Sequence, residues 1–147
     1  MINIEFVKLD ARAVVPSYSH AHDAGADLTA IEDISIAPGQ RILARTGISI
    51  AIPAGFVGLI HPRSGLATKH GVTVVNAPGT IDSGYRGEIK IGLINLDPHE
   101  VVQLPAGTRI AQLVIQRVET AAFVQTDSLD DTSRGVDGFG STGMTHG

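Results

Sequence analysis

The sequence predicts an all-β domain in the form of a sandwich, a jelly roll or a barrel. Short apolar runs alternate with polar residues at a period of two, which is typical of strands with one buried face. Turn sequences rich in glycine and proline separate these runs at short intervals, as in all-β folds of these three kinds. Aromatic residues make up only 4% of the chain and tryptophan is absent, so we expect an aliphatic core.

The expected strands follow one another along the chain. Residues 2–7 alternate between apolar and polar types, and in residues 47–52 the isoleucines Ile48, Ile50 and Ile52 fall on one face. Only residues 66–70 look helical, over about one turn, with Ser64 as the expected cap. Further strands are expected at 56–60, 72–75, 88–95, 100–104 and 109–118, with turns at 37–39, 53–55, 97–98 and 105–107.

Length and composition indicate one soluble domain. A chain of 147 residues fits the usual size of a domain and can bury roughly 70% of its unfolded surface. The absence of cysteine excludes disulfides and thiolate metal sites, and no apolar run approaches the ~20 residues of a membrane span. The net charge of −4 argues against a duplex-binding protein, although local cations and backbone N–H groups could still hold a small polyanion. We therefore expect a cytoplasmic protein with no nucleic-acid or membrane partner.

Residues 76–88 carry the pattern that most directly suggests chemistry. A carboxylate, Asp82, and an aromatic ring, Tyr85, lie within a turn rich in glycine and proline. Such turns let the backbone approach a ligand closely and leave N–H and C=O groups free to read it. A strand expected at 88–95 follows at once and would hold the turn rigid, so this segment is a candidate catalytic loop.

Three further segments contain polar residues that could carry chemistry. Arg63, Ser64 and Gly65 offer a planar guanidinium, a hydroxyl and accessible backbone N–H groups, although the same residues also occur in ordinary turns. Asp27 could cap a turn, or it could position a water molecule or a metal ion. Gln112 interrupts an apolar strand and, if buried, needs a partner, either backbone or ligand.

The histidines and the C-terminal segment give weaker signals. His20 and His22 have the spacing of a metal pair, but no third ligand falls at a useful distance along the chain, so we assign no histidine to catalysis. Residues 127–147 are rich in Gly, Ser, Thr and Asp and cannot bury enough apolar surface to order alone. This segment contains Arg134 and Phe139, and it is either a solvated tail or a segment that orders on a phosphate ligand.

Together these segments form five ordered motifs, and the chain resembles the trimeric dUTPases. The motifs are residues 23–28, 62–67, 76–88, 109–113 and 134–143. The resemblance implies a jelly-roll-like β-barrel over residues 1–126, assembled as a homotrimer with active sites at the subunit interfaces. It also implies that residues 127–147 form a glycine-rich lid that closes over the active site of a neighbouring subunit.

The resemblance further implies a reaction and its cofactor. A dUTPase hydrolyses dUTP to dUMP and pyrophosphate, which limits uracil in DNA and supplies dUMP for thymidylate synthesis. Asp82 would orient and deprotonate a water molecule that attacks the α-phosphorus. Mg²⁺ on the triphosphate would neutralise charge, and Asp27 would meet this metal ion through water.

The family's binding residues can be assigned by the same resemblance. Asn76 and the hairpin backbone around Thr80, Ile81 and Lys90 would read uracil. Tyr85 would pack on the deoxyribose and exclude a ribose 2′-hydroxyl, and Phe139 would stack on the base. Arg63, Gln112 and Arg134 would hold phosphates. The complete set of expected substrate-binding residues is Arg63, Ser64, Gly65, Asn76, Gly79, Thr80, Ile81, Asp82, Tyr85, Lys90, Gln112, Arg134, Phe139, Gly140, Ser141 and Thr142.

Two alternative functions share this scaffold. A dCTP deaminase, or a deaminase with dUTPase activity, would need a glutamate as proton shuttle on the strand after the loop, where this chain has Gly92. A nucleotide-binding trimer without catalysis is the second alternative. Loss of Asp82, Arg63 or Tyr85 would favour it, and all three are present.

Overall fold

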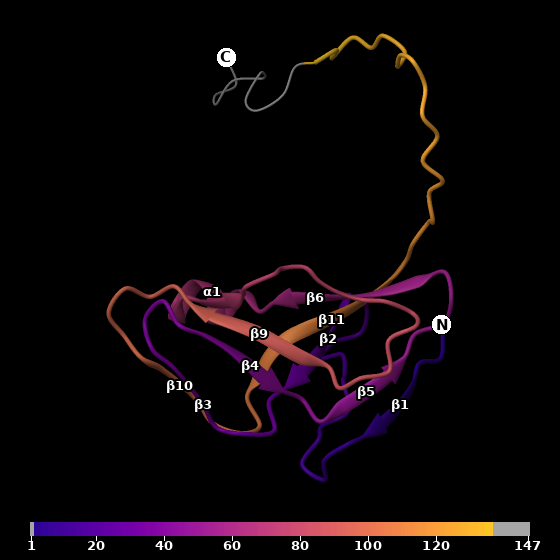
Figure 1. Ribbon diagram of the computed structural model, residues 1–147. Coiled ribbons are helices and arrows are strands. Elements are labelled where there is room, and N and C mark those ends of the chain that lie inside the picture. The colour runs from indigo at the N-terminus through magenta and orange to yellow at the C-terminus, as the bar shows by residue number, and fades with distance from the viewer. Residues whose placement is uncertain (1, 137–147) are drawn as a thin grey trace.

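The chain folds as a β-barrel around an aliphatic core (Figure 1), as the computed structural model of residues 2–136 shows. The buried hydrophobic residues are all alanine, isoleucine, leucine or valine, as expected for a chain without tryptophan. The elements are β1 (Glu5–Lys8), β2 (Gly25–Thr29), β3 (Ile34–Ile36), β4 (Arg41–Arg45), β5 (Ile48–Ala51), β6 (Phe56–Pro62), α1 (Ser64–His70), β7 (Val72–Val74), β8 (Gly79–Ile81), β9 (Lys90–Asn95), β10 (Val102–Leu104) and β11 (Arg109–Arg117).

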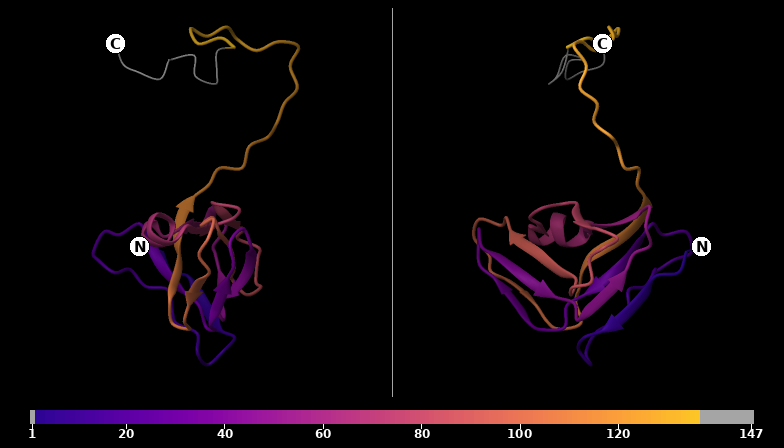
Figure 2. Two further views of the ribbon diagram at one scale, coloured as in Figure 1. Left: turned by 90° about the vertical axis from the view of Figure 1, so that its left-hand side faces the viewer. Right: turned by 45° about the vertical axis from the view of Figure 1, so that its right-hand side comes forward.

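Four small sheets make up the barrel wall. Their strand orders are β1-β5, β10-β3, β2-β11-β6-β8 and β4-β9-β7, and every pairing is antiparallel. The sheets wrap around the core in all three views (Figures 1 and 2), and α1 lies at the end of the barrel from which the C-terminal segment departs. The all-β prediction with one short helix is confirmed.

Alternating isoleucines of β5 face the core as predicted. Ile48, Ile50 and Ile52 are 0%, 4% and 2% exposed. Ser49, on the opposite face, is also buried, because it lies against residues 86–89 of the loop between β8 and β9. Its hydroxyl donates a hydrogen bond to the Arg86 carbonyl. Both faces of this strand are therefore covered.

Some expected elements differ in extent. The first strand is β1, whose four residues are all exposed, and so the alternation in residues 2–7 does not mark a half-buried strand in this chain. The strand expected at 88–95 begins at Lys90. The sequence did not predict β2, β3, β4 or β8.

The helix begins earlier than predicted and is not capped by Ser64. Ser64 is the first helical residue, and Arg63 occupies the N-cap position without a side-chain capping bond. The helix ends at Gly71, whose φ of +65° lies in the left-handed region that favours glycine. Backbone N–H groups at this cap bond to the Ala67 and Leu66 carbonyls. A side chain here would also meet the Asp97 backbone, with the added Cβ 2.7 Å from its nitrogen.

The chain leaves the barrel after β11. Residues 118–136 contain no helix or strand and are exposed, and they run away from the barrel in Figures 1 and 2. None of the helices in the described part of the chain is long and apolar enough to cross a membrane.

Candidate active site

Most of the predicted site residues gather around two pockets. The larger, of about 510 Å³, is here called the β8–β9 pocket and is lined by Leu43, Ile60, Asn76, Gly79, Thr80, Ile81, Asp82, Tyr85, Glu88, Ile89 and Lys90. The smaller, of about 230 Å³, is called the α1 pocket and is lined by Arg63, Ser64, Gly65, Leu66, Lys69, His70 and Gln112. The expected base-reading and sugar-reading residues thus lie together, and so do the four phosphate-binding candidates from the barrel.

The β8–β9 pocket lies between strands of two different sheets, which corrects the predicted hairpin. β8 is the edge strand of the β2-β11-β6-β8 sheet, whereas β9 is the central strand of the β4-β9-β7 sheet. β7 pairs with β9 only at residues 93–95, so the first part of β9 has a strand partner on the β4 side alone. Because the two strands do not pair with each other, backbone groups along their facing edges are available to a ligand in the pocket.

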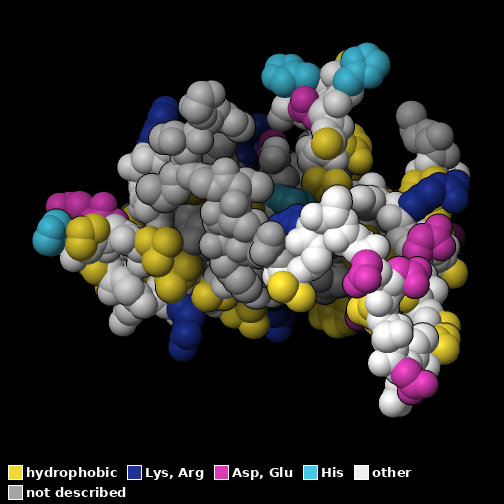
Figure 3. All heavy atoms as spheres, turned by 90° about the horizontal axis from the view of Figure 1, so that it is seen from above, with side chains coloured by type: hydrophobic (Ala, Val, Ile, Leu, Met, Phe, Trp, Pro, Cys, Tyr) yellow, Lys and Arg dark blue, Asp and Glu magenta, His cyan; other side chains and the backbone are white. Residues whose placement is uncertain are grey.

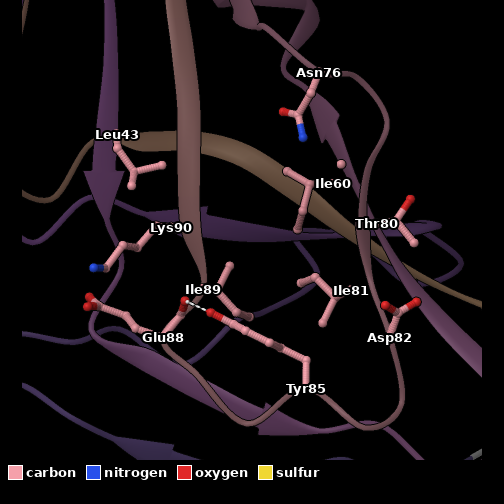
Figure 4. Close-up of a pocket in the computed structure, with 11 residues that line it drawn as sticks. Leu43, Ile60, Asn76, Thr80, Ile81, Asp82, Tyr85, Glu88, Ile89 and Lys90 are labelled. Carbon is pink, nitrogen blue, oxygen red and sulfur yellow. Dashed lines mark hydrogen bonds between the residues drawn. The ribbon is translucent and has the colours of Figure 1, made fainter.

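The pocket has an apolar floor and polar sides (Figure 4). Ile60, Ile81 and Ile89 form the floor, and all are buried. Asp82 lies on one side at the end of β8, and Lys90 lies on the opposite side at the start of β9. An apolar floor with a few polar groups at its sides is the usual composition of a small-molecule site.

Tyr85 lies across the end of the pocket and is held at both its backbone and its hydroxyl. Its N–H donates to the Asp82 carbonyl at 3.0 Å, and its hydroxyl donates to the Glu88 carbonyl at 3.0 Å (Figure 4). The Tyr85 side chain passes so close to Gly87 that a Cβ at that position would overlap its hydroxyl. The loop therefore fixes the ring while leaving the residue 47% exposed to a ligand.

The α1 pocket combines Arg63, Ser64, Gly65 and Gln112, which come from distant parts of the sequence. β6 delivers the first three at its C-terminal end, and β11 delivers Gln112, because Gln112 is the register partner of His61. An ideal Cβ placed on Gly65 would have no atom within 4 Å, so the space beside this backbone is open. The pocket is suited to an oxyanion that approaches both the guanidinium and the backbone.

Asp27 lies behind this pocket as the centre of a hydrogen-bonded cluster. It is the register partner of Gln112 in the β2–β11 pairing, which places the two side chains on the same face of the sheet. Gln112 donates to Oδ1 at 3.4 Å, and Arg63 Nε lies 3.2 Å from the same oxygen. Oδ2 accepts from Arg109 Nη1 at 2.9 Å and from Ser19 Oγ at 3.1 Å. The partner that Gln112 needs is thus a carboxylate.

These contacts change the acidity of Asp27. Burial raises its pKa, but hydrogen bonds from Arg109 and Ser19, the charge of Arg63 and the Gln112 amide outweigh burial, and the pKa lies below its ordinary value. Asp27 is only 6% exposed. It is therefore a buried carboxylate held in its charged form by two arginines.

A protein-built metal cage is not present among residues 2–136. They hold no group of three or more His, Asp or Glu side chains able to bind a metal ion. The Asp27 carboxylate accepts three hydrogen bonds, from Ser19, Arg109 and Gln112, and is also ion-paired with Arg63. The site fits a Mg²⁺ ion held by substrate phosphates and water, and the predicted water-mediated contact to Asp27 would compete with the partners that this carboxylate has now.

Sequence reasoning missed several residues of these sites. Arg109 belongs to one of the five motifs, but sequence reasoning gave it no role. Its position at the start of β11, the strand that also carries Gln112, could have marked it as a site residue. Ser19 carries no local signal, because only the fold brings it to Asp27. Leu43 and Glu88 line the β8–β9 pocket, and Leu43 comes from a strand that was not predicted.

Only one of the C-terminal candidates, Arg134, belongs to the described residues. Arg134 lies in the exposed segment beyond the barrel and is absent from the linings of the two pockets described above. Phe139, Gly140, Ser141 and Thr142 lie outside the described residues.

Comparison with known proteins identifies the family. The family model described as dUTPase matches residues 11–143. The chain belongs to the dUTPase family. A deoxyuridine 5′-triphosphate nucleotidohydrolase of Thermobifida fusca is 60% identical over 142 residues, covering 97% of this chain and 79% of that protein. The enzyme of the same name from Rhodococcus erythropolis is 56% identical over 142 residues, covering 97% of this chain and 87% of that protein.

Solved dUTPases share the fold. The G164S mutant of the Staphylococcus bacteriophage 80alpha dUTPase, determined with dUpNHpp, aligns with a TM-score of 0.89 at 27% identity, covering 98% of this chain and all of that one. The D95N mutant of the phage phi11 dUTPase aligns with a TM-score of 0.80 at 25% identity, covering 86% of this chain and 98% of that one. That second structure is described as revealing how a structural Mg(II) ion is coordinated.

Proposed function

We propose that this protein is a dUTP diphosphatase, which hydrolyses dUTP to dUMP and pyrophosphate. Membership of the dUTPase family supports the activity. The observation that carries the assignment to residues is the β8–β9 pocket, where Asp82 and Tyr85 belong to one short loop beside two unpaired strand edges. This pocket can take a pyrimidine, a deoxyribose and the start of a phosphate chain.

Uracil recognition follows from the chemistry of the strand edges. Uracil presents O4 and O2 as acceptors and N3–H as a donor, and backbone N–H and C=O groups of Thr80, Ile81 and Lys90 can match them. The Asn76 amide, at the far end of the pocket in Figure 4, adds a side-chain donor and acceptor. Cytosine has an amine where uracil has O4, so the same backbone would face it with donor against donor. Tyr85 would pack on the sugar and leave no space for a 2′-hydroxyl.

Asp82 would act as the general base. Its carboxylate is exposed at the pocket edge, where it can accept a hydrogen bond from a water molecule, align this water with the α-phosphorus and take its proton as the new P–O bond forms. The bond to the bridging oxygen then breaks, and pyrophosphate leaves. Mg²⁺, when bound to the triphosphate, supplies charge neutralisation, and the protein supplies position and orientation.

The α1 pocket would hold the outer phosphates. Arg63 would turn part of its guanidinium, which now faces Asp27 and the Arg109 carbonyl, toward the phosphates, and Ser64, Gly65 and Gln112 would add neutral donors. Lys69 and His70 line the same pocket and add to its polar rim. The two pockets share no lining residue, so one substrate molecule must bring together groups from two separate surfaces.

We further propose that these surfaces meet between subunits of a homotrimer. An apolar groove of about 500 Å³, here called the N-terminal groove, lies beside β1 and includes Phe6 and Tyr18, which are 46% and 55% exposed. Phe123 and Leu129, in the segment after β11, are 99% and 90% exposed. Exposed apolar surface of this extent is typical of protein–protein contacts.

Residues 127–147 would then close over a neighbour's site, as the domain division at residue 126 predicts. Arg134 would bind the γ-phosphate and Phe139 would stack on uracil, with Gly140, Ser141 and Thr142 donating to phosphate. On the face of the described residues that Figure 3 shows, Lys and Arg side chains are scattered and do not form one patch. The net charge of −4 supports a small-molecule partner over a nucleic acid. The cytoplasmic location stays a prediction.

Gly92 disfavours the deaminase alternative. A Cβ at this position would lie 3.1 Å from Val75 Cγ1 and 3.8 Å from the Asn76 side chain, so a glutamate would need its neighbours to move. No proton shuttle of the deaminase kind is available at this position. A binding protein without catalysis would keep the pocket and lack turnover.

A nucleotide panel tests the function. Purified protein is incubated with dUTP, UTP, dCTP or dTTP, with Mg²⁺ or with EDTA, and pyrophosphate and ammonia are measured. We expect pyrophosphate from dUTP with Mg²⁺ and little from the other nucleotides. Ammonia from dCTP at a comparable rate would indicate deamination, and tight dUTP binding without pyrophosphate would indicate the non-catalytic alternative.

A further inference from the structure

The loop between β8 and β9 carries Asp82 and Tyr85, and residues outside the five motifs bind it to the barrel. These residues, Arg45 to Ser49, run from the end of β4 into β5 and are here called the 45–49 anchor. The hydrogen bonds and the ion pair of the anchor to the loop reach its second half, residues 86–89. The first half is continuous with β8, which pairs with β6.

Five groups of the anchor bind the loop. Ser49 Oγ donates to the Arg86 carbonyl at 2.6 Å, and Thr46 Oγ1 donates to the Ile89 carbonyl at 2.6 Å. The backbone of Ile48 accepts from the Ile89 N–H at 2.8 Å. The Glu88 carboxylate accepts from the Gly47 N–H at 2.9 Å and from Arg45 Nε, which lies 3.2 Å from both of its oxygens.

The two hydroxyls of the anchor are shielded from water, which makes their bonds effective, whereas the Arg45 side chain is 39% exposed. Thr46 is 1% exposed and Ser49 is 8% exposed, and the Glu88 side chain is 11% exposed. A buried hydroxyl without its partner carries the cost of losing water, so each bond strongly favours this one position of the loop.

The anchor reaches Tyr85 through Glu88. The carboxylate of Glu88 is bound to Arg45 and Gly47, while the carbonyl of the same residue accepts the Tyr85 hydroxyl bond. Moving Glu88 therefore moves the acceptor that fixes the ring. Ser49 acts on the same chain segment, because Arg86 is the residue next to Tyr85.

We propose that the 45–49 anchor, through Ser49 and the Arg45–Glu88 ion pair, positions Tyr85 and thereby sets discrimination between dUTP and UTP. The inference rests on the proposed role of Tyr85 in excluding a 2′-hydroxyl. A ring that stays in place would collide with the extra oxygen of a ribose, whereas a ring that can retreat would admit it. Ser49 and Glu88 are thus positioning residues that act through the ring.

The test uses the ratio of kcat/KM for dUTP to kcat/KM for UTP. We expect Ser49→Ala and Glu88→Gln each to lower this ratio by about tenfold or more, mainly by a gain in UTP turnover. Ser49→Thr, which keeps the hydroxyl, should retain most of the wild-type ratio. A smaller folded fraction lowers both rates equally and leaves the ratio unchanged, so simple destabilisation cannot produce the expected result.

A matched control removes a serine bond elsewhere in the barrel. Ser35 Oγ accepts from Gln103 Nε2 at 2.8 Å between β3 and β10, outside both pocket linings. Ser35→Ala should leave the ratio at the wild-type value. A fall in this control equal to that of Ser49→Ala would contradict a specific role for the anchor.

A second readout is independent of turnover. The chain has two tyrosines, so protein labelled with 3-fluorotyrosine gives two ¹⁹F resonances, and Tyr18→Phe assigns them. We expect Ser49→Ala and Glu88→Gln to shift or broaden the Tyr85 resonance. Wild-type resonances together with a wild-type ratio would overturn the proposal.

The same data separate the inference from the proposed role of Tyr85. If the resonance moves but the ratio does not, the anchor does not set discrimination and the proposal is overturned. The ratio of kcat/KM for dUTP to that for UTP is then measured for Tyr85→Ala. A lowered ratio in Tyr85→Ala leaves the sugar role of Tyr85 intact, and an unchanged ratio removes that role as well.

Discussion

Replacing Asp27 with asparagine tests whether this carboxylate holds the arginine cluster. The amide keeps one oxygen, which can still accept from Gln112, but it loses the charge that pairs with Arg63, and its nitrogen faces the Arg109 guanidinium. Hydrogen bonds to charged groups contribute about 1.5–3 kcal/mol each. Because the Arg109 side chain is 51% exposed and can turn to solvent, we take the lower part of this range and expect a loss of about 2 kcal/mol.

The assay is urea unfolding of Asp27→Asn and wild type in EDTA without nucleotide, at one protein concentration. If the same two proteins are unfolded by heat instead, a loss of about 2 kcal/mol lowers the melting temperature by about 4–8 °C for a chain of this size. The control is Asp10→Asn, which breaks an exposed ion pair with Arg12 and should shift the midpoint less.

The pH dependence has a defined sign. Because folding lowers the pKa of Asp27, its contribution is complete above the ordinary aspartate pKa of about 3.9 and is lost as the pH falls through the lowered value. The difference between wild type and Asp27→Asn should therefore be full at pH 7 and shrink below about pH 4. Equal stability of the two proteins at pH 7 in EDTA would refute the arginine cluster and leave metal contact through water as the role of Asp27.

Three further changes test other parts of the account. Asp82→Asn should keep dUTP affinity within a few-fold but lower kcat by about 10²–10⁴, measured by pyrophosphate release, and near-normal kcat would remove Asp82 from the base role. Truncation after Ser133 should leave the circular dichroism spectrum and oligomer size unchanged while most activity is lost, whereas full activity would make the removed segment a passive extension. Asn95 is 0% exposed and donates to the Ile36 and Glu100 carbonyls. Asn95→Leu should lower the free energy of unfolding, measured by urea titration, by about 2–4 kcal/mol, and no change would mean that these bonds are dispensable.

The fold and the candidate catalytic loop were predictable because their signals are local. Alternation in residues 47–52 identifies β5, and glycine and proline around Asp82 identify a turn. β2 was missed because its buried polar residue, Asp27, breaks the apolar pattern. β8 was missed because three residues between turn signals carry no visible period.

Long-range register decides the rest of the site. Gln112 was expected to bind backbone or ligand, and only the pairing of β2 with β11 shows that it faces Asp27. Ser49 belongs to the face of β5 opposite its isoleucines, and its burial depends on a loop some forty residues later in the chain. Contacts between such distant segments leave no mark in a single sequence.

The most direct test of the central claim is hydrolysis of dUTP in H₂¹⁸O, with mass spectrometry of both products. Attack of an Asp82-oriented water on the α-phosphorus predicts that the heavy oxygen appears in dUMP and that pyrophosphate stays unlabelled. Label in pyrophosphate, with unlabelled dUMP, would show attack at the β-phosphorus and contradict the account.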